Sequence, residues 1–105
     1  MTTQILTYAV LFALSMVRAA AGPSEGKEVY DAKCKACHGA QGQGNPGLAK
    51  MMKVEIPALG SKEVQAKSDA ELKKVITDGK GKMKPVAGLS AKQVDDVVVF
   101  IRTLK

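Results

Sequence analysis

The two cysteines and the single histidine of this 105-residue chain lie within five consecutive positions, because residues 34–38 read CKACH. Random shuffling of the same composition would give this spacing in about two of ten thousand sequences. The pattern therefore constrains the chain more than any other feature, and the fold has to accommodate the chemistry that it carries.

Two thiols three positions apart, with an imidazole next to the second, are the groups that a covalently attached haem requires. Cys34 and Cys37 can each add to one vinyl group of the same porphyrin, and His38 can bind its iron as the proximal ligand. We predict one haem c, held by two thioether bonds to Cys34 and Cys37 and ligated by His38.

Three other interpretations of residues 34–38 are open. A Cys34–Cys37 disulfide would resemble redox CxxC motifs, but these accompany a βαβ pattern that we do not find here. A zinc site needs a fourth ligand, and the chain has neither a second CxxC nor a second histidine. Two buried thiols beside a structural His38 are the third interpretation.

The small number of aromatic side chains indicates that this domain needs more than its own core. The four aromatic residues are Tyr8, Phe12, Tyr30 and Phe100. If the first two leave with a leader, a mature chain of about 84 residues buries only about 60% of its unfolded surface. Such domains usually contain a disulfide, a metal, a cofactor or a bound partner.

The charge balance gives a weaker indication of partners. Sixteen basic residues against ten acidic ones give a net charge of +6, which favours an acidic or anionic partner. The basic residues are mostly scattered lysines, without an arginine cluster or a row of aromatic side chains that would stack on bases. We therefore do not expect a nucleic-acid partner.

Residues 1–21 have the pattern of an export signal. The stretch 5–17 is mostly apolar but only 13 residues long, whereas a helix needs about 20 to span a bilayer. A short apolar run followed by small residues predicts a secretory signal peptide cleaved near Ala21. We expect a signal peptide at 1–21 and one domain at 22–105, in the periplasm or another extracytoplasmic compartment. An uncleaved membrane anchor or a core helix is the alternative.

Helix signals occur along the remaining chain. Ser24 is a candidate N-cap for a helix over 25–33. The sequence SDAE at 68–71 is a capping-box pattern, and it opens a predicted helix through Thr77 that Gly79 ends. A second such pattern, SAKQ at 90–93, opens the final helix.

The final helix has one apolar stripe at helical spacing, formed by Val94, Val97, Val98, Ile101 and Leu104. By contrast, residues 39–48, GAQGQGNPGL, are predicted to be irregular, because glycine and proline interrupt both periodicities. We find no convincing strand. The predicted class is all-α, with three to four short helices around one covalently attached haem.

The motif and its surroundings resemble the class I c-type cytochromes, which are small soluble proteins with one haem. The resemblance covers residues 24–105. It implies an electron carrier that cycles between Fe(II) and Fe(III), not an enzyme, with redox proteins as partners and no small-molecule substrate. It also implies a monomer in which the first helix crosses the C-terminal helix closely, with Gly26 at the contact and Tyr30 beside it.

The sixth ligand of the iron cannot be a second histidine from the same chain. Methionine, lysine or an open site remain, and Met51, Met52 and Met83 are the methionines outside the leader. Met83 lies in the glycine-rich stretch DGKGKMKP at 78–85, between two helix signals. The resemblance implies that Met83 is the distal ligand, although Pro85 follows it by two positions where many members have proline immediately after.

Two further roles are predicted with alternatives. The carbonyl group of Pro46 is a candidate acceptor for the second ring N–H of His38, which would fix its tautomer, or Pro46 is an ordinary turn proline. Four lysines, Lys35, Lys80, Lys82 and Lys84, could surround an exposed haem edge and attract an acidic docking surface, or could serve solubility.

Two other functions compete with a free carrier. The first is a haem enzyme or gas sensor with a labile sixth ligand, for which the sequence offers no second histidine and no arginine near the motifs. The second is an electron-transfer module docked to a larger oxidoreductase complex.

Overall fold

The computed structural model describes residues 22–105, so the predicted signal peptide lies outside the described residues. These described residues form six helices: α1 (Pro23–Lys33), α2 (Lys35–His38), α3 (Pro46–Met52), α4 (Lys62–Gln65), α5 (Asp69–Asp78) and α6 (Ala91–Arg102). Within 22–105 the only extended pairing is an isolated bridge between Lys80 and Met83. The all-α prediction is confirmed, with more helices than expected because two of them are single turns.

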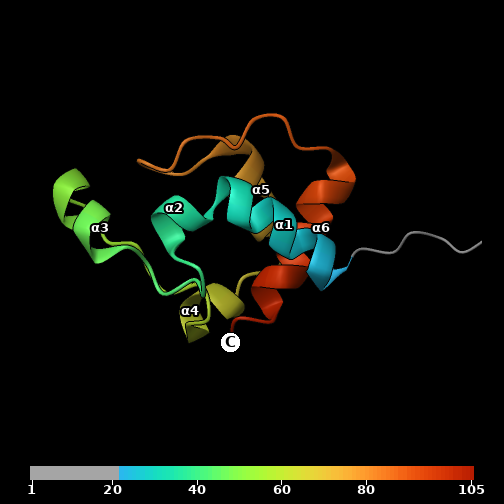
Figure 1. The fold of residues 1–105 in the computed structure, drawn as a ribbon, viewed down its shortest axis with the longest axis horizontal. Coiled ribbons are helices and arrows are strands. Elements are labelled where there is room, and N and C mark those ends of the chain that lie inside the picture. The colour runs from blue at the N-terminus through green and yellow to red at the C-terminus, as the bar shows by residue number, and fades with distance from the viewer. Residues whose placement is uncertain (1–21) are drawn as a thin grey trace, which may run out of the picture.

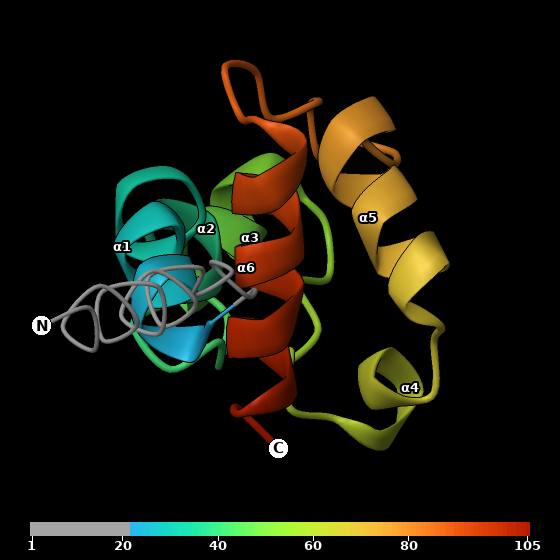
Figure 2. The same cartoon turned by 90° about the vertical axis from the view of Figure 1, so that its right-hand side faces the viewer.

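Helix α6 lies between α1 on one side and α5 on the other (Figures 1 and 2). At the crossing with α1, a Cβ atom on Gly26 would lie 2.0 Å from the backbone oxygen of Asp96. Tyr30 is fully buried beside this contact, and its ring centroid is 5.0 Å from that of Phe100. The close crossing implied by Gly26 and Tyr30 is therefore present.

The hydrophobic core forms where α4, α5 and α6 meet. Its buried members are Val64, Leu72, Ile76, Val94, Val97, Val98 and Ile101. Four of these belong to the stripe predicted on the final helix, and the fifth member of that stripe, Leu104, is half-buried. The helical spacing of apolar residues thus located the buried face of α6 correctly.

The N-caps predicted from the sequence are confirmed for α5 and α6, but the one predicted for α1 is wrong. Ser68 and Ser90 both form complete capping boxes. Ser24, however, is not a cap, because α1 begins at Pro23, two residues before the predicted start, with Gly22 as its N-cap. Proline is favoured at the first helical position, where its fixed φ suits the helix and no N–H is needed.

The prediction that residues 39–48 are wholly irregular is wrong at its end. Residues 39–45 are irregular, but Pro46 is the first residue of α3. The side chain of Asn45 accepts a hydrogen bond from the Leu48 N–H at 3.1 Å and caps the helix. Asparagine followed by proline is a signal for the start of a helix, because asparagine is favoured as the N-cap and proline as the first helical residue. The glycines that precede this pair favoured the prediction of a loop instead.

Between α5 and α6 the chain makes a tight turn. Lys80 and Met83 exchange two backbone hydrogen bonds of 2.9 Å, and the Val86 N–H donates to the Ile76 carbonyl of α5 at 2.9 Å. Gly79 ends α5 at φ 78°, close to the backbone of Met83 and Pro85. Across the part of the chain that the structure describes, we find no helix of the length and apolarity that a membrane crossing requires.

Candidate haem site

The site is built on the junction between α1 and α2. Cys34 is both the C-cap of α1 and the N-cap of α2. Its carbonyl group accepts hydrogen bonds from the N–H groups of Cys37 (3.3 Å) and His38 (3.0 Å). One short turn therefore holds both thiols and the imidazole. Cys34 is half-buried, Cys37 is exposed, and both thiols are free.

The environment of Cys34 differs from that of a redox-active cysteine. Burial, followed by the neighbouring Cys37, raises the pKa of Cys34 to about 11. A nucleophilic CxxC cysteine has a lowered pKa instead, because the thiolate is the reactive form. The raised pKa of Cys34 therefore argues against disulfide exchange at residues 34–38.

His38 is the part of the site that lacks a partner. Its side chain is half-buried, and burial lowers its pKa, which favours the neutral imidazole that a metal requires. Among residues 22–105, its Nδ1 atom is the one buried side-chain nitrogen or oxygen without a hydrogen bond. A buried polar atom without a partner points to a missing contact. Nδ1 is the nitrogen that the predicted contact with the Pro46 carbonyl would use, which would leave Nε2 for the iron.

The irregular segment 39–45 folds back onto α2. The Gly44 N–H donates to the His38 carbonyl at 2.6 Å, the Asn45 N–H donates to the Cys37 carbonyl at 3.0 Å, and the Asn45 side-chain amide donates to the Ala36 carbonyl at 3.2 Å. Sequence reasoning missed Asn45, which both fixes α2 and caps α3. The Asn–Pro pair was the signal that could have found it.

Tyr30 connects this segment to α1. Its hydroxyl group donates a hydrogen bond of 2.5 Å to the carbonyl group of Gly39, the residue that directly follows His38. Burial is the main reason that the pKa of Tyr30 rises to about 12, with smaller contributions from Cys34 and Asp31. The phenol thus stays protonated as a donor and holds the chain where it leaves the imidazole.

Pro46 lies near the site but is not bonded to His38. It is exposed at the start of α3 and lines a hollow of about 290 Å³ together with Gln43, Gly44, Asn45, Ala49 and Ile56. His38 Nδ1 has no hydrogen bond to any described residue, so the predicted contact with the Pro46 carbonyl is not formed here. That role of Pro46 stays a prediction.

Met83 is half-buried in the tight turn after α5, whereas the side chain of Met51 on α3 is 77% exposed. The Lys82 ammonium group donates to the Met52 carbonyl at 2.6 Å, which joins the turn to the end of α3. No sequence pattern predicts this contact, because it joins residues 30 positions apart. A backbone hydrogen bond therefore joins the turn that carries Met83 to α5, and an exposed side-chain contact joins it to α3.

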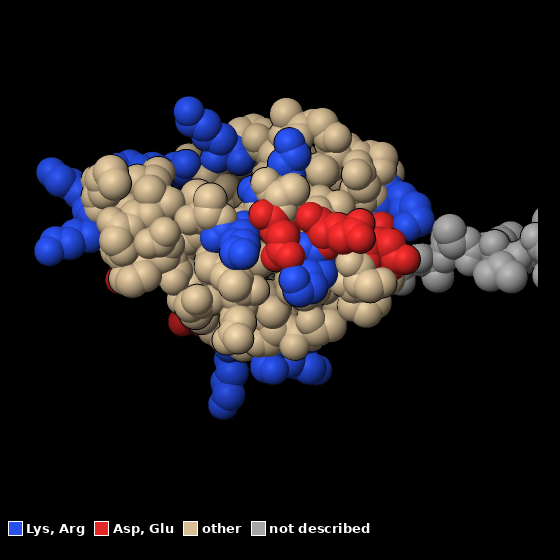
Figure 3. Space-filling model, viewed as in Figure 1, with Lys and Arg blue, Asp and Glu red and all other residues tan. Residues whose placement is uncertain are grey.

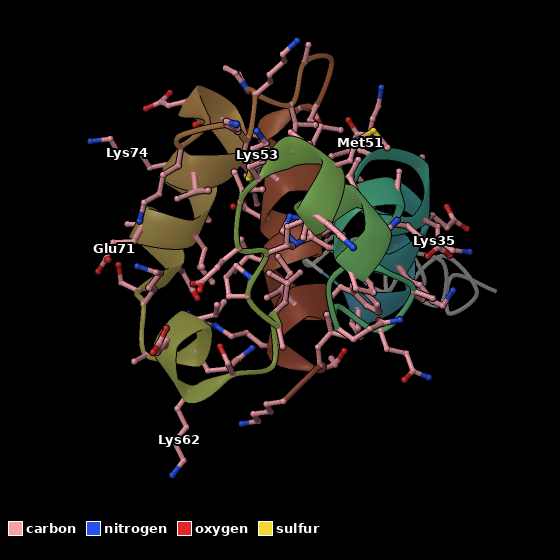
Figure 4. All side chains as sticks on the ribbon, turned by 90° about the vertical axis from the view of Figure 1, so that its left-hand side faces the viewer. Lys35, Met51, Lys53, Lys62, Glu71 and Lys74 are labelled. Atoms are coloured by element: carbon pink, nitrogen blue, oxygen red, sulfur yellow. The ribbon has the colours of Figure 1, made fainter. Side chains whose placement is uncertain are left out.

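The charged side chains are unevenly distributed. Acidic side chains gather over α1, while lysines cover the end of the molecule formed by α3 and the 80–84 turn (Figure 3). Figure 4 shows the face of the molecule that α3 covers, and three labelled residues lie there: Lys35, Met51 and Lys53. Lys62 projects from α4 at the lower end of the same view.

Comparison with known proteins identifies the family. Residues 21–101 match the family model described as "Cytochrome C oxidase, cbb3-type, subunit III". The chain belongs to the c-type cytochromes. This cytochrome is 38% identical to cytochrome c-554(547) of Halothiobacillus neapolitanus over 85 residues, which cover 76% of this chain and 93% of the relative.

A solved structure titled "KustC0563 c-type cytochrome" matches the cytochrome with a TM-score of 0.66 and 28% identity. The match covers 76% of this chain and 96% of the other. The fold predicted from the motif is therefore confirmed, and the cytochrome carries covalently bound haem c. The two free thiols and the imidazole of residues 34–38 fit this cofactor.

Proposed function

We propose that this cytochrome is an electron carrier that passes single electrons between redox proteins, with His38 and Met83 as the two axial ligands. When bound, the haem would supply the Fe(II)/Fe(III) couple, and a histidine and methionine ligand pair would raise its reduction potential. The protein contributes a fixed environment, so that little rearranges when the charge of the iron changes.

The clamped turn at residues 80–83 carries this proposal. Two backbone hydrogen bonds close the turn, and the contact of Lys82 with the Met52 carbonyl holds it against α3. A ligand on such a turn does not leave easily, whereas an enzyme or gas sensor needs a sixth position that opens. Met51 is exposed on α3, which suits it less as a ligand.

The test is the visible spectrum of the haem-loaded protein with single methionine variants. We expect the oxidised parent to show the weak sulfur-to-iron band, and Met83→Ala to lose it. Met51→Ala is the matched control and should keep the band. Rapid CO binding by the reduced parent, or retention of the band in Met83→Ala, would contradict His38/Met83 ligation and favour a sensor or enzyme.

The basic end of the molecule supports docking to an acidic partner. Its exposed lysines are Lys35, Lys50, Lys53, Lys80, Lys82 and Lys84, contributed by α2, the end of α3 and the turn. A surface of one charge sign speeds association with a surface of the other sign, and salt screens this attraction. We propose that redox partners present carboxylates to this end.

Stopped-flow transfer to an acidic redox protein tests the docking surface. The rate constant should fall as ionic strength rises, and Lys50→Gln with Lys84→Gln should make this dependence shallower. Lys62→Gln, on the distant helix α4, should leave the dependence unchanged. A rate constant that ignores salt, or an equal effect of Lys62→Gln, would remove this surface from the proposal.

A module of a larger complex is the second candidate function. The matched family model is named for a subunit of a cytochrome oxidase, and that name is the observation that favours it. Size-exclusion chromatography of the native source distinguishes the two. A carrier elutes at the size of the single chain, whereas a module elutes with a membrane-bound or multi-subunit partner.

A further inference from the structure

Asp96 is the one charged side chain that is buried within residues 22–105, with 2% of its surface exposed. It lies on α6 beside the crossing with α1. Its Oδ2 atom accepts a hydrogen bond from the Lys92 ammonium group at 2.9 Å, and its Oδ1 atom accepts one from the Gly22 N–H at 3.0 Å. A buried carboxylate needs compensation, and the Lys92 side chain is 46% exposed to water.

The second partner, Gly22, directly follows the run of small residues that ends at Ala21. Such a run is where a signal peptidase cleaves. Gly22 is also the N-cap of α1, and Pro23 follows it as the first helical residue. The backbone nitrogen that contacts Asp96 is therefore the atom that cleavage after Ala21 would turn into an amine.

We propose that the signal peptide is removed between Ala21 and Gly22, and that the new α-ammonium group of Gly22 forms an ion pair with the buried carboxylate of Asp96. Signal peptidase adds one water to the Ala21–Gly22 peptide bond. Ala21 leaves with the carboxylate, and Gly22 keeps the nitrogen, which takes up a proton. An amide with one N–H thus becomes a cation with three, at the place where Asp96 already accepts a hydrogen bond.

The surroundings explain why Asp96 matters for this group. A positive charge at the N-terminus of a helix is opposed by the helix dipole, so the new ammonium group needs a nearby anion. Asp96 is that anion at 3.0 Å, Glu25 lies in the first turn of α1, and Lys92 shares the carboxylate. If the mature chain began at Ala21, Gly22 would keep its amide N–H. If it began at Pro23, the Gly22 nitrogen would be absent.

The ion pair has a defined pH dependence. Asp96 favours the charged form of the amine and therefore raises its pKa in the folded state above the unfolded value. The stability that the pair contributes is then fully present below the unfolded pKa. It is lost as the pH rises through the folded pKa, because the folded amine then also releases its proton.

The experiment uses haem-loaded protein exported with its own leader. Intact mass should correspond to residues 22–105 plus one haem. The rate at which an amine-reactive reagent acylates Gly22 is followed against pH by peptide mass spectrometry. In the parent the midpoint of this profile should lie about one pH unit or more above that of Asp96→Asn.

Asp95→Asn is the matched control, because Asp95 is the neighbouring residue and pairs at the surface with Lys73 at 2.6 Å. It should leave the midpoint unchanged. If Asp96→Asn does not fold, the parent unfolded in guanidinium replaces it as the reference for a free amine. A mature chain that does not begin at Gly22, or a folded midpoint equal to the reference, overturns the proposal.

Discussion

At the scale of single residues, Gly26 sets how closely two helices approach. Helix α1 can lie against α6 only because residue 26 has no side chain where the Asp96 backbone passes. The approach also brings Tyr30 against Phe100 and lets its hydroxyl group reach Gly39, next to His38. The position of the imidazole therefore depends on a glycine twelve positions before it in the sequence.

We expect Gly26→Ala to destabilise the haem-loaded protein by about 1–3 kcal/mol, the usual cost of overpacking a close contact. The added Cβ would lie 2.0 Å from a backbone oxygen, so a rotamer change cannot relieve the clash. Denaturant unfolding measures this loss.

Gly47→Ala on α3 is the matched control, because its Cβ would meet only the Asn45 Oδ1 atom at 3.5 Å. Alanine is the better helix former, so this variant should be as stable as the parent or more stable by up to about 1 kcal/mol. Equal losses from both variants would show that the crossing is not close.

The sequence alone predicted Cys34, Cys37 and His38 because covalent haem chemistry imposes their spacing. It predicted Gly26 through a resemblance, and the structure supplies the reason. It could not predict the contact between Lys82 and Met52, or the unpaired Nδ1 of His38, because both depend on how distant segments meet in space.

At the scale of elements, short polar sequences decided where helices begin. The capping boxes of α5 and α6 were predictable because the side chain and backbone groups that form them lie within four residues. The start of α3 depends on the same kind of local signal, Asn45 followed by Pro46, but the surrounding glycines suggested a loop. The error at α1 arose because Ser24 is a good cap residue in general, while Pro23 fixes the start two residues before the predicted one.

Removing a true cap should cost more than removing a serine that only resembles one. We expect Ser68→Ala to destabilise the protein by about 1 kcal/mol, because the Glu71 N–H loses its acceptor at 3.1 Å. The measurement is the midpoint of urea unfolding. Ser24→Ala is the control and should change stability little, since the Ser24 hydroxyl group only donates to Glu25. A larger loss for Ser24→Ala would restore it as the cap of α1.

At the scale of the whole molecule, the polypeptide supplies only part of its own core. The contacts between helices are concentrated on α1 with α6, α5 with α6, and α1 with α2. Helices α2 and α3 contain no buried residue. Residues 22–105 contain two aromatic side chains, and neither α2 nor α3 buries a residue, so we expect this part of the chain to depend on its cofactor, as the composition had indicated.

Loss of haem should therefore destabilise residues 35–60 before the rest of the molecule. In a haem-free Cys34→Ala/Cys37→Ala chain, we expect the amides of residues 35–60 to exchange hydrogen almost as fast as in an unfolded chain. Scattered single hydrogen bonds, such as those of Gly44, Asn45 and the Tyr30 hydroxyl group, hold the start of this segment, and α2 and α3 bury no residue. Helix α6, with six buried residues, should keep the most protection.

Hydrogen exchange with mass spectrometry measures both regions. Met83→Ala with haem attached is the control that should keep residues 35–60 protected. Equal protection of this segment with and without haem would mean that the chain completes its fold alone, and that the cofactor only occupies a site already formed.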